Sequence, residues 1–543
     1  MISKVLIENF RSIEKLEFEP KNLCALIGPN SVGKTNILKA INKLLGEVYP
    51  TQNVFTKDDF FNRDTNRTIK IQVWFKEPIE GQKLTSVSTR QKTFCNNPIS
   101  FVLTNTQKED EFFSHQFKVI DQSGNEFWGD GTIREKLSFI YIPSERDLDK
   151  QMSISQWTLI GKMLKVIDEN FRKKDPGQDM SEIEKEFRQS MIAPKEILEK
   201  DFSDNLTYKK FKDEFLATAK DHAQGLAEEF SVDLEIYDPL FYYKTIQILG
   251  KEQGGIFNLT ELGSGVQNLV LLSLFRTYAK LMKHRAVLAI EEPEIYLYPQ
   301  AQRHLYKHFR NLSATSQIFY TTHSPSFVDA PNYDEICMIK KSDGKTIYVP
   351  KEFDLAQNER EEIKILTEFN TERNELFFAD RVILVEGQTE KQSIPFILEK
   401  LGKSCERENI AIIECGGKEG LPYYIKICRA LKLNWCCIYD WDRVEDDTDE
   451  IKSGKRVTGI NVQIRDIAGD QSDRLICLNP DFQSVSRLQK NGRKWKEIRD
   501  ARAKYMNIAK DDIPSDLAKI VEILYPKTRQ EELELTEAED ISF

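Results

Sequence analysis

A glycine-rich loop near the start of the chain is the first group of residues that could do chemistry. The run Gly28-Pro29-Asn30-Ser31-Val32-Gly33-Lys34-Thr35 matches the pattern G-x-x-x-x-G-K-[ST], between strand-like residues 23–27 and helix-like residues 35–45. In such a loop, backbone amides cradle phosphates, the lysine neutralises the β- and γ-phosphates, and the threonine hydroxyl holds Mg²⁺. The loop therefore predicts a site for MgATP, with the candidate residues Asn30, Ser31, Gly33, Lys34, Thr35 and Asn36.

Two later strand ends add polar groups to this candidate site. Apolar residues 286–290 lead into Glu291-Glu292-Pro293-Glu294, and residues 317–320 lead into Thr321-Thr322-His323-Ser324. Taken alone, the acids fit a solvated strand end, and a lone histidine is more often structural. Their order after a P-loop favours another role: Glu291 on the Mg²⁺ side, Glu292 as the base that polarises water, and His323 as a further catalytic group.

A second group of acids follows two strands in the last third of the chain. Residues 381–385 run into Glu386 and Glu390, and residues 435–439 run into Asp440 and Asp442. If these strands are parallel neighbours, their carboxyl ends face one crevice, where the four acids can bind one or two ions of Mg²⁺, or of Mn²⁺ or Ca²⁺. Two such ions stabilise the attacking and leaving oxygens of a phosphodiester. Either pair alone is equally well explained as a wet strand end.

The hydrophobic pattern predicts an α/β protein of several domains, because 543 residues exceed what a single core holds. We expect an α/β domain with the P-loop at 1–150 and 246–350, interrupted by a helical insertion at 151–245. A linker helix at 351–376 and a second α/β domain at 377–543 should follow.

Composition restricts the partners and the compartment. With 77 Lys and Arg against 87 Asp and Glu, the formal net charge is -10, so DNA would have to meet a local basic surface. The nine cysteines form no C-x-x-C pair, which argues against zinc and favours a reducing compartment. We see no signal peptide and no apolar segment long enough for a bilayer, so we expect a cytoplasmic protein without a membrane partner.

The N-terminal motifs resemble those of the SMC/RecF-type ABC ATPases. The resemblance rests on the opening run Ile7-Glu8-Asn9-Phe10-Arg11-Ser12-Ile13, the P-loop, the small-residue turn Leu262-Gly263-Ser264-Gly265-Val266-Gln267, the acidic strand and the histidine. It implies ATP held between two heads, with Ser264 and Gly265 reaching the nucleotide bound by the other head. The turn departs from the usual L-S-G-G-Q, and Glu291 stands where Asp is common.

The C-terminal acids resemble a Toprim domain, in which a Glu-Gly turn follows the first strand and D-x-D follows a later one. A Toprim domain joined to an ABC-type ATPase, and entered through Glu375-Leu376-Phe377-Phe378-Ala379, is similar to the OLD (overcoming lysogenization defect) family of nucleases. This resemblance implies an ATP-regulated, metal-dependent DNA endonuclease in antiphage defence. It also implies a homodimer or higher homo-oligomer formed through the insertion. Family members act alone, beside a helicase-like partner or with a retron.

The same resemblance implies one more acid and a lysine late in the Toprim domain. The matching segment is Leu478-Asn479-Pro480-Asp481-Phe482-Gln483, where Gln483 stands at the position expected for Glu, so that Asp481 serves instead or the second metal is held more weakly. The lysine is Lys494 or Lys496, and spacing does not choose between them.

Two other functions fit the same motifs. A DNA-binding ATPase clamp with vestigial Toprim acids is favoured by Gln483. A topoisomerase or primase-like enzyme also uses Toprim acids, but it would need an added nucleophilic tyrosine domain or a polymerising site, and we find neither in the sequence.

Overall fold

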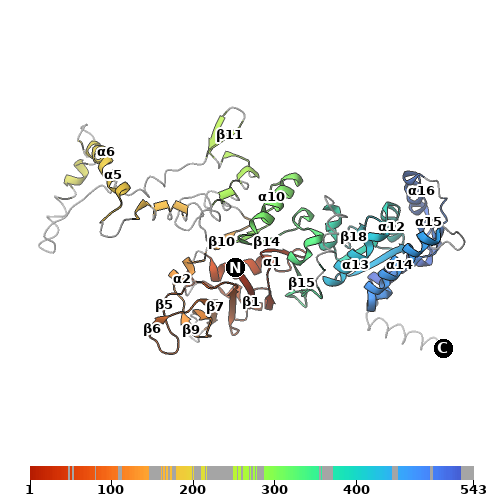
Figure 1. The fold of residues 1–543 in the computed structure, drawn as a ribbon, viewed down its shortest axis with the longest axis horizontal. Helices are drawn as coiled ribbons and strands as arrows, with labels where there is room; N and C mark the ends of the chain where they lie inside the picture. Colours follow the sequence, from red (N-terminus) through yellow and green to blue (C-terminus); the bar gives the residue numbers. More distant parts are fainter. Residues whose placement is uncertain are drawn as a thin grey trace. The chain divides into compact units, whose positions relative to one another are not determined.

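The structure is a computed structural model that describes residues 1–145 and 286–526 apart from short gaps, and separate stretches between 146 and 285. The described residues form two compact units, one of 1–144 with 285–543 and the other of 145–284 (Figure 1). The gaps in the two long ranges are residues 47–48, 52–53, 80, 108–112, 138, 354–355, 357–370, 443–449 and 490–492.

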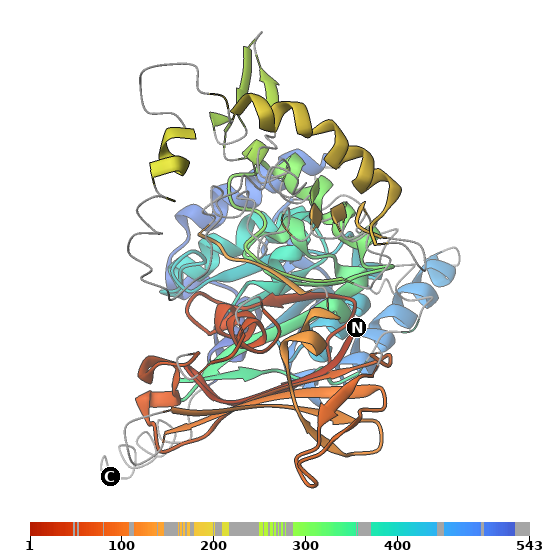
Figure 2. The ribbon, with the colours of Figure 1, turned by 90° about the vertical axis from the view of Figure 1, so that its left-hand side faces the viewer.

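An antiparallel sheet opens the larger unit, with the strand order β2-β1-β4-β7-β8-β9 (red to orange in Figure 2). Strand β1 pairs with β2 on one side and with β4 on the other, so the first residues of the chain lie inside the sheet. The strands are β1 (Ile2–Phe10), β2 (Ile13–Phe18), β4 (Ile69–Phe75), β7 (Pro98–Gln107), β8 (Phe113–Asp121) and β9 (Glu126–Trp128), with a separate hairpin of β5 (Lys83–Thr85) and β6 (Lys92–Phe94).

A second sheet carries the P-loop, in the order β10-β13-β14-β3-β15-β16, and all its pairs are parallel except β15 with β16. Every residue of β3, β13 and β14 is buried, as the continuous apolar runs of a covered parallel sheet require. Because these strands are parallel, their carboxyl ends meet at one edge. The strands are β3 (Leu23–Ile27), β10 (Phe139–Ile142), β13 (Val287–Glu291), β14 (Gln317–Thr321), β15 (Ile336–Ser342) and β16 (Lys345–Tyr348).

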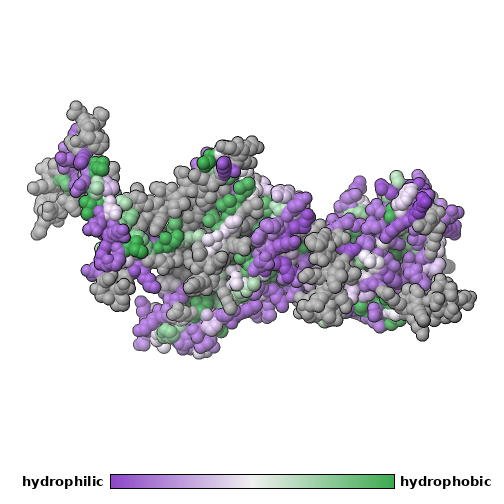
Figure 3. Space-filling model, turned by 45° about the horizontal axis from the view of Figure 1, so that its top comes forward, coloured by the Kyte–Doolittle hydropathy of each residue, from purple (hydrophilic) through white to green (hydrophobic). Residues whose placement is uncertain are grey.

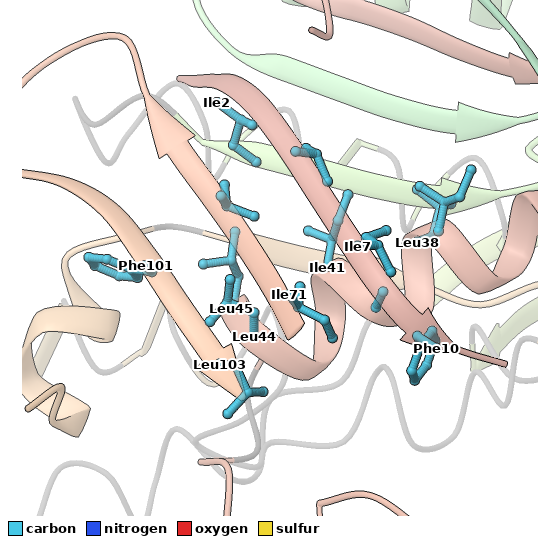
Figure 4. Close-up of a cluster of buried hydrophobic side chains, with 14 of the residues drawn as sticks. Ile2, Ile7, Phe10, Leu38, Ile41, Leu44, Leu45, Ile71, Phe101 and Leu103 are labelled. Carbon is cyan, nitrogen blue, oxygen red and sulfur yellow. The ribbon is translucent and has the colours of Figure 1, made fainter. Parts of the chain in front are cut away.

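Helix α1 (Lys34–Leu45) packs its apolar face against the antiparallel sheet. Leu38 and Ile41 approach Ile7 of β1 and Ile71 of β4 in Figure 4, and all four side chains are fully buried. The apolar residues of α1 recur at the helical spacing of three and four, which is why one face of the helix closes this core. The core therefore fixes the helix whose first residue is the P-loop lysine.

Gln317 joins the two sheets through a side chain that is completely buried. Its Oε1 accepts the backbone N–H of Ile2 at 2.7 Å, and its Nε2 donates to the carbonyls of Ile2 at 2.9 Å and Lys21 at 3.1 Å. One amide thus satisfies two buried backbone groups of Ile2 and the carbonyl of Lys21.

The C-terminal part of the larger unit is a parallel sheet in the order β18-β17-β19-β20, which confirms the expected second α/β domain. Strands β17 and β19 are neighbours, with Val385 opposite Ile438. The strands are β17 (Arg381–Val385), β18 (Ile410–Glu414), β19 (Trp435–Asp440) and β20 (Leu475–Leu478). The helices are α12 (Gln388–Lys400), α13 (Leu421–Ala430), α14 (Glu450–Ala468), α15 (Phe482–Val485), α16 (Lys494–Asn507) and α17 (Ser515–Leu524).

A short 3₁₀ helix, η6 (Thr371–Phe377), lies where we expected the end of a linker helix; most of that expected helix lies outside the described residues. The buried Asn374 donates to the carbonyls of Pro325 at 3.0 Å and Val328 at 2.8 Å, just after the His323 segment. The preceding Arg373 forms an ion pair of 3.0 Å with Glu414 at the end of β18. Of these two neighbouring residues of η6, Asn374 therefore contacts the P-loop domain and Arg373 contacts the C-terminal sheet.

The other α-helices and strands of the described residues lie in both units. Those of the larger unit are α2 (Gly131–Glu135) and α10 (Pro299–Leu312), and those of the smaller unit are α5 (Glu182–Ser190), α6 (Ile192–Leu198), β11 (Leu249–Glu252) and β12 (Gly255–Asn258). Hydrophilic side chains cover most of the described surface visible in Figure 3. Among the described residues, no helix has both the length and the apolar character to cross a bilayer.

Replacing Gln317 with Leu is expected to destabilise the P-loop domain, because the buried backbone N–H and C=O of Ile2 lose their side-chain partner. Each buried group left unsatisfied costs about 1–3 kcal/mol, so the free energy of unfolding should fall by at least that amount. Urea denaturation followed by tryptophan fluorescence measures the change. The matched substitution of the exposed Gln116 should stay within about 0.5 kcal/mol of wild type, and an equal effect of the two would contradict this role for Gln317.

Candidate nucleotide and metal sites

The P-loop joins β3 to α1 through a backbone that favours glycine. Gly28 and Gly33 have φ angles of 146° and 103°. A Cβ on Gly28 would also lie 2.0 Å from the carbonyl oxygen of Ile339, so the loop passes too close to β15 for a side chain. Asn30 and Ser31 are exposed at the tip, whereas Thr35 is half-buried in the first turn of the helix. This is the geometry in which loop amides face a phosphate.

Lys34 lies inside the loop with its ammonium on backbone carbonyls. Its Nζ donates to the oxygens of Gly28 and Pro29, both at 2.8 Å. Burial lowers the pKa of Lys34 to about 8, although the carboxylates of Glu292 and Glu294 act in the opposite direction. The lysine is therefore a desolvated cation that can exchange its hydrogen bonds to two neutral carbonyls for a charge-assisted contact with a phosphate.

Asn36 is held by the turn that follows β1. Its Nδ2 donates to Ser12 Oγ at 2.9 Å, and its Oδ1 accepts from Arg11 at 3.4 Å. Arg11 in turn forms an ion pair of 2.9 Å with the buried Asp59. The opening run noted in the sequence thus contacts the first turn of α1, and Asn36 fixes that turn rather than pointing freely toward a ligand.

Glu291 is buried at the end of β13 and already accepts hydrogen bonds. Tyr141 donates to Oε1, while the backbone N–H and the hydroxyl of Ser144 donate to Oε2 at 3.2 and 3.1 Å. These donors orient the carboxylate at the edge where the P-loop begins. Its role beside Mg²⁺ stays a prediction.

Glu294 contacts the histidine segment, a role that the sequence analysis missed. Its Oε1 accepts from Thr322 Oγ1 at 2.9 Å and from the His323 backbone N–H at 2.7 Å, while its buried Oε2 has no hydrogen-bond partner among the described residues. Burial raises the pKa of Glu294. Burial also lowers the pKa of His323, and so does the positive charge of Lys34. Glu292 adopts a φ of 44° in the turn between these acids.

The expected signature residues belong to the smaller unit. Ser264 lies outside the described residues, and Gly265 begins a helical stretch in that unit. Their contact with a nucleotide stays a prediction.

Three of the four expected carboxylates meet at the ends of β17 and β19. Glu386, Asp440 and Asp442 each offer an oxygen, and these oxygens lie within 4.8 Å of one another. The backbone N–H of Asp440 donates to Glu386 Oε1 at 2.8 Å, which fixes one acid against the next strand. Asp440 Oδ1 accepts from the backbone N–H of Phe482 at 2.9 Å. Oxygen ligands from several carboxylates are the donor set that Mg²⁺, Mn²⁺ and Ca²⁺ prefer, so the cluster fits a divalent ion.

The electrostatics of the cluster favour a cation. Burial raises the pKa of Glu386 to about 7. Burial, followed by the charges of Glu386 and Glu390, raises the pKa of Asp440 to about 8. Such acids carry charge at neutral pH only at a cost, which a bound cation offsets.

The remaining expected residues take different places. Glu390 is buried in the first turn of α12, close enough that its charge acts on Asp440, but it is outside the three-acid group. Asp481 begins α15 and accepts the N–H of Ser484 at 2.7 Å, as a helix cap does. Burial raises the pKa of Glu390, and the charge of Lys494 opposes this. Lys496 lies 5.7 Å from the exposed ring of Trp495. The charge of Lys494 therefore acts on one of the expected acids, and which late lysine is catalytic stays a prediction.

Lys418 is a cation in the carboxylate group that the sequence analysis did not assign. Its Nζ lies 3.1 Å from Asp442 Oδ2 and 3.9 Å from Glu386 Oε1, and it donates to the carbonyl of Asp440. The available signal was the pair Gly416-Gly417 directly before it, which indicated a close approach of the backbone at a strand end.

Comparison with known proteins agrees with these two sites. A family model described as an AAA ATPase domain matches residues 1–328, and one described as the Toprim domain of overcoming lysogenization defect-like proteins matches residues 377–442. The second match contains all three clustered acids and Lys418.

Three relatives align with most of this chain at low identity. An OLD nuclease of Thermus scotoductus is 27% identical over 90% of this chain and 92% of its own. The endonuclease GajA of Bacillus cereus is 23% identical over 76% of this chain and 70% of its own. The Old nuclease of Escherichia phage P2 is 23% identical over 81% of this chain and 77% of its own. The chain therefore belongs to the AAA ATPase family of the first match, and an OLD-like Toprim domain follows the ATPase.

Proposed function

We propose that this protein is a divalent-metal-dependent DNA endonuclease whose cleavage is regulated by ATP. The observation that supports it best is the meeting of Glu386, Asp440 and Asp442 within 4.8 Å at the end of a parallel sheet. Three relatives that align with most of the chain are named nucleases or endonucleases.

In this proposal the three acids, with Glu390 close behind them, hold the metal ions. A bound divalent ion supplies a polarised water and neutralises charge on the phosphodiester. Glu386 and Asp440 keep their relative positions through the hydrogen bond between them, so the ligands are oriented before metal binds. Lys494, whose charge reaches Glu390, stabilises charge on the phosphate.

DNA is proposed to approach along α16, where charge and an aromatic ring lie together. The Trp495 side chain is 59% exposed, and Lys496 and Arg499 lie 5.7 and 5.5 Å from its ring. Basic groups around an exposed aromatic ring favour nucleic acid, because they neutralise the backbone while a base stacks.

ATP is proposed to bind at Lys34 and Thr35 and to alter cleavage through the loops at the edge of the sheet. Glu291, Glu292 and His323 are the proposed groups around the γ-phosphate, and Glu294 holds the His323 backbone in place. Hydrolysis is part of the proposal. Whether ATP raises or lowers the cleavage rate is measured by the ATP titration of wild type and Lys34→Ala below.

Several parts of the proposal rest on the family resemblance alone. They are antiphage defence, a homodimer formed through 151–245, and the contact of Ser264 and Gly265 with the nucleotide of a second head. The domain limits 1–150, 151–245, 246–350, 351–376 and 377–543 are proposed from the hydrophobic pattern of the sequence.

A clamp that binds DNA without cutting it is the second candidate. It is favoured by Asp481, which caps α15 through its Oδ1, and by Gln483 in place of an acid, since both reduce the ligands for a second metal ion. A clamp retains DNA binding and ATP hydrolysis and cuts no DNA under any metal.

Substituting Glu386 with Gln is expected to lower cleavage of supercoiled plasmid in Mg²⁺ or Mn²⁺ roughly 100-fold or more. Groups that merely support metal ligands already contribute about 10–100-fold. Gel analysis of nicked and linear plasmid measures the rate, with the exposed Glu399→Gln on α12 as the matched control. Undiminished cleavage by Glu386→Gln would remove this site from the reaction, and an inert wild type that still binds DNA would favour the clamp.

Lys34→Ala is expected to abolish the effect of ATP on cleavage while leaving cleavage without nucleotide within about twofold of wild type, because Lys34 lies in the P-loop and not among the Toprim acids. Plasmid cleavage over a range of ATP concentrations measures both quantities. An ATP response that persists in Lys34→Ala would show that regulation does not pass through the P-loop.

Lys494→Ala is expected to slow single-turnover cleavage about 100-fold, the size of effect found when one donor to a developing anion is removed. Lys496→Ala should mainly weaken DNA binding and flatten its salt dependence. Equal losses of cleavage rate in the two variants, measured at saturating protein, would contradict the distinction between the two lysines.

A further inference from the structure

Lys418 is buried among groups that the proposed function assigns to metal. Its side chain is 9% exposed, and its ammonium faces Asp442 at 3.1 Å, Glu386 at 3.9 Å and the Asp440 carbonyl. The ring of Tyr439 lies 5.8 Å from the same Nζ. These partners all belong to the two strand ends that form the acid cluster, so the lysine serves this cluster and no other part of the surface.

A backbone turn places Lys418 at this position, and the turn is hydrogen-bonded to the end of β17. Gly416 and Gly417 have φ angles of 79° and 103°, which a residue with a side chain rarely adopts. The N–H of Gly417 donates to the carbonyl of Glu386 at 2.9 Å. A Cβ on Gly417 would meet nothing within 4 Å, so the conformation and not the available space requires glycine. The turn that holds the lysine is thus tied directly to an acid of the cluster.

Charge balance explains why a lysine lies here. Glu386 and Asp440 are largely desolvated carboxylates that repel one another and the more exposed Asp442, and one buried ammonium offsets part of that repulsion in the protein without metal. A divalent ion bound by the same three acids carries twice that charge and would use the Asp442 carboxylate that Lys418 contacts. The two cations would repel strongly at this separation, so both cannot stay on the same carboxylates.

We propose that Lys418 is a positioning residue that occupies the cation position of the Toprim cluster, and that a divalent metal ion binds by displacing its ammonium from Asp442. The lysine keeps the acids in their ligand arrangement and weakens metal binding at the same time. This inference rests on the metal site of the proposed function, and it adds the group that sets the affinity of that site.

An ordinary structural ion pair makes a different prediction. If Lys418 only stabilises the turn, its loss lowers the unfolding temperature and leaves metal affinity unchanged or reduced, because the acids lose their order. If Lys418 competes with metal, its loss lowers the unfolding temperature without metal and strengthens metal binding. The sign of the change in affinity separates the two.

Mn²⁺ binding to the full chain without nucleotide, measured by calorimetry and by the electron paramagnetic resonance signal of free Mn²⁺, provides the test. Lys418→Met keeps the length and apolar stem of the side chain and removes its charge, and Lys418→Gln serves as the second variant if the first does not fold. Lys418→Arg keeps the charge. Lys403→Met is the matched control. Lys403 also forms an ion pair in this domain, at 3.8 Å from Glu408. It follows the end of α12 that is opposite to Glu390. Glu386→Gln identifies the binding that belongs to the cluster.

Lys418→Met is expected to bind Mn²⁺ at least about tenfold more tightly than wild type, because unit charges at this separation interact by more than the free energy of a tenfold change. Its unfolding temperature in EDTA should fall by a few degrees, and added Mn²⁺ should raise that temperature more than it does in wild type. Lys418→Arg and Lys403→Met should keep the wild-type affinity.

Unchanged or weaker Mn²⁺ binding by both Lys418→Met and Lys418→Gln, with binding that still depends on Glu386, overturns the role of Lys418 and leaves the metal site of the proposed function intact. Wild-type protein without any Glu386-dependent Mn²⁺ binding overturns both.

Discussion

Acids at the ends of buried parallel strands carry charge that the strands themselves cannot compensate. Both α/β parts of this chain meet that constraint in the same way, with one buried lysine delivered by a glycine turn. Lys34 follows Gly33 beside Glu292 and Glu294, and Lys418 follows Gly417 beside its own acids. The two sites bind different ligands in our proposal, yet the strand ends, the turn and the cation form the same arrangement in each.

The same constraint explains what each lysine contacts when no ligand is present. In the P-loop the ammonium rests on two neutral carbonyls, so a phosphate gains a charge-assisted contact without breaking an ion pair. In the Toprim cluster the ammonium rests on a carboxylate, so an incoming cation has to break one. The first lysine attracts its ligand and the second opposes it.

Sequence patterns were sufficient where chemistry depends on spacing along the chain. The P-loop, its helix and the acids after β17 and β19 were all predicted, because apolar strands followed by polar residues can be recognised from the sequence alone. The sequence analysis had to assume that the two strands before these acids are parallel neighbours, and the parallel pairing of β17 with β19 confirms this assumption. Glu294 and Lys418 were missed, since which of several acids or lysines reaches a site depends on backbone turns. Our proposal of Lys494 over Lys496 likewise depends on tertiary structure, because it rests on the charge of Lys494 acting on Glu390.

The contacts of η6 have a mechanical consequence for the larger unit. Asn374 uses its amide nitrogen on two carbonyls that follow the His323 segment, and the adjacent Arg373 holds Glu414, two residues before the turn that ends in Lys418. If the segment after His323 moves, η6 either moves with it or the buried Asn374 amide loses its two acceptors. Losing these acceptors costs about 1–3 kcal/mol for each buried group left unsatisfied, so the contacts favour movement of η6 together with that segment.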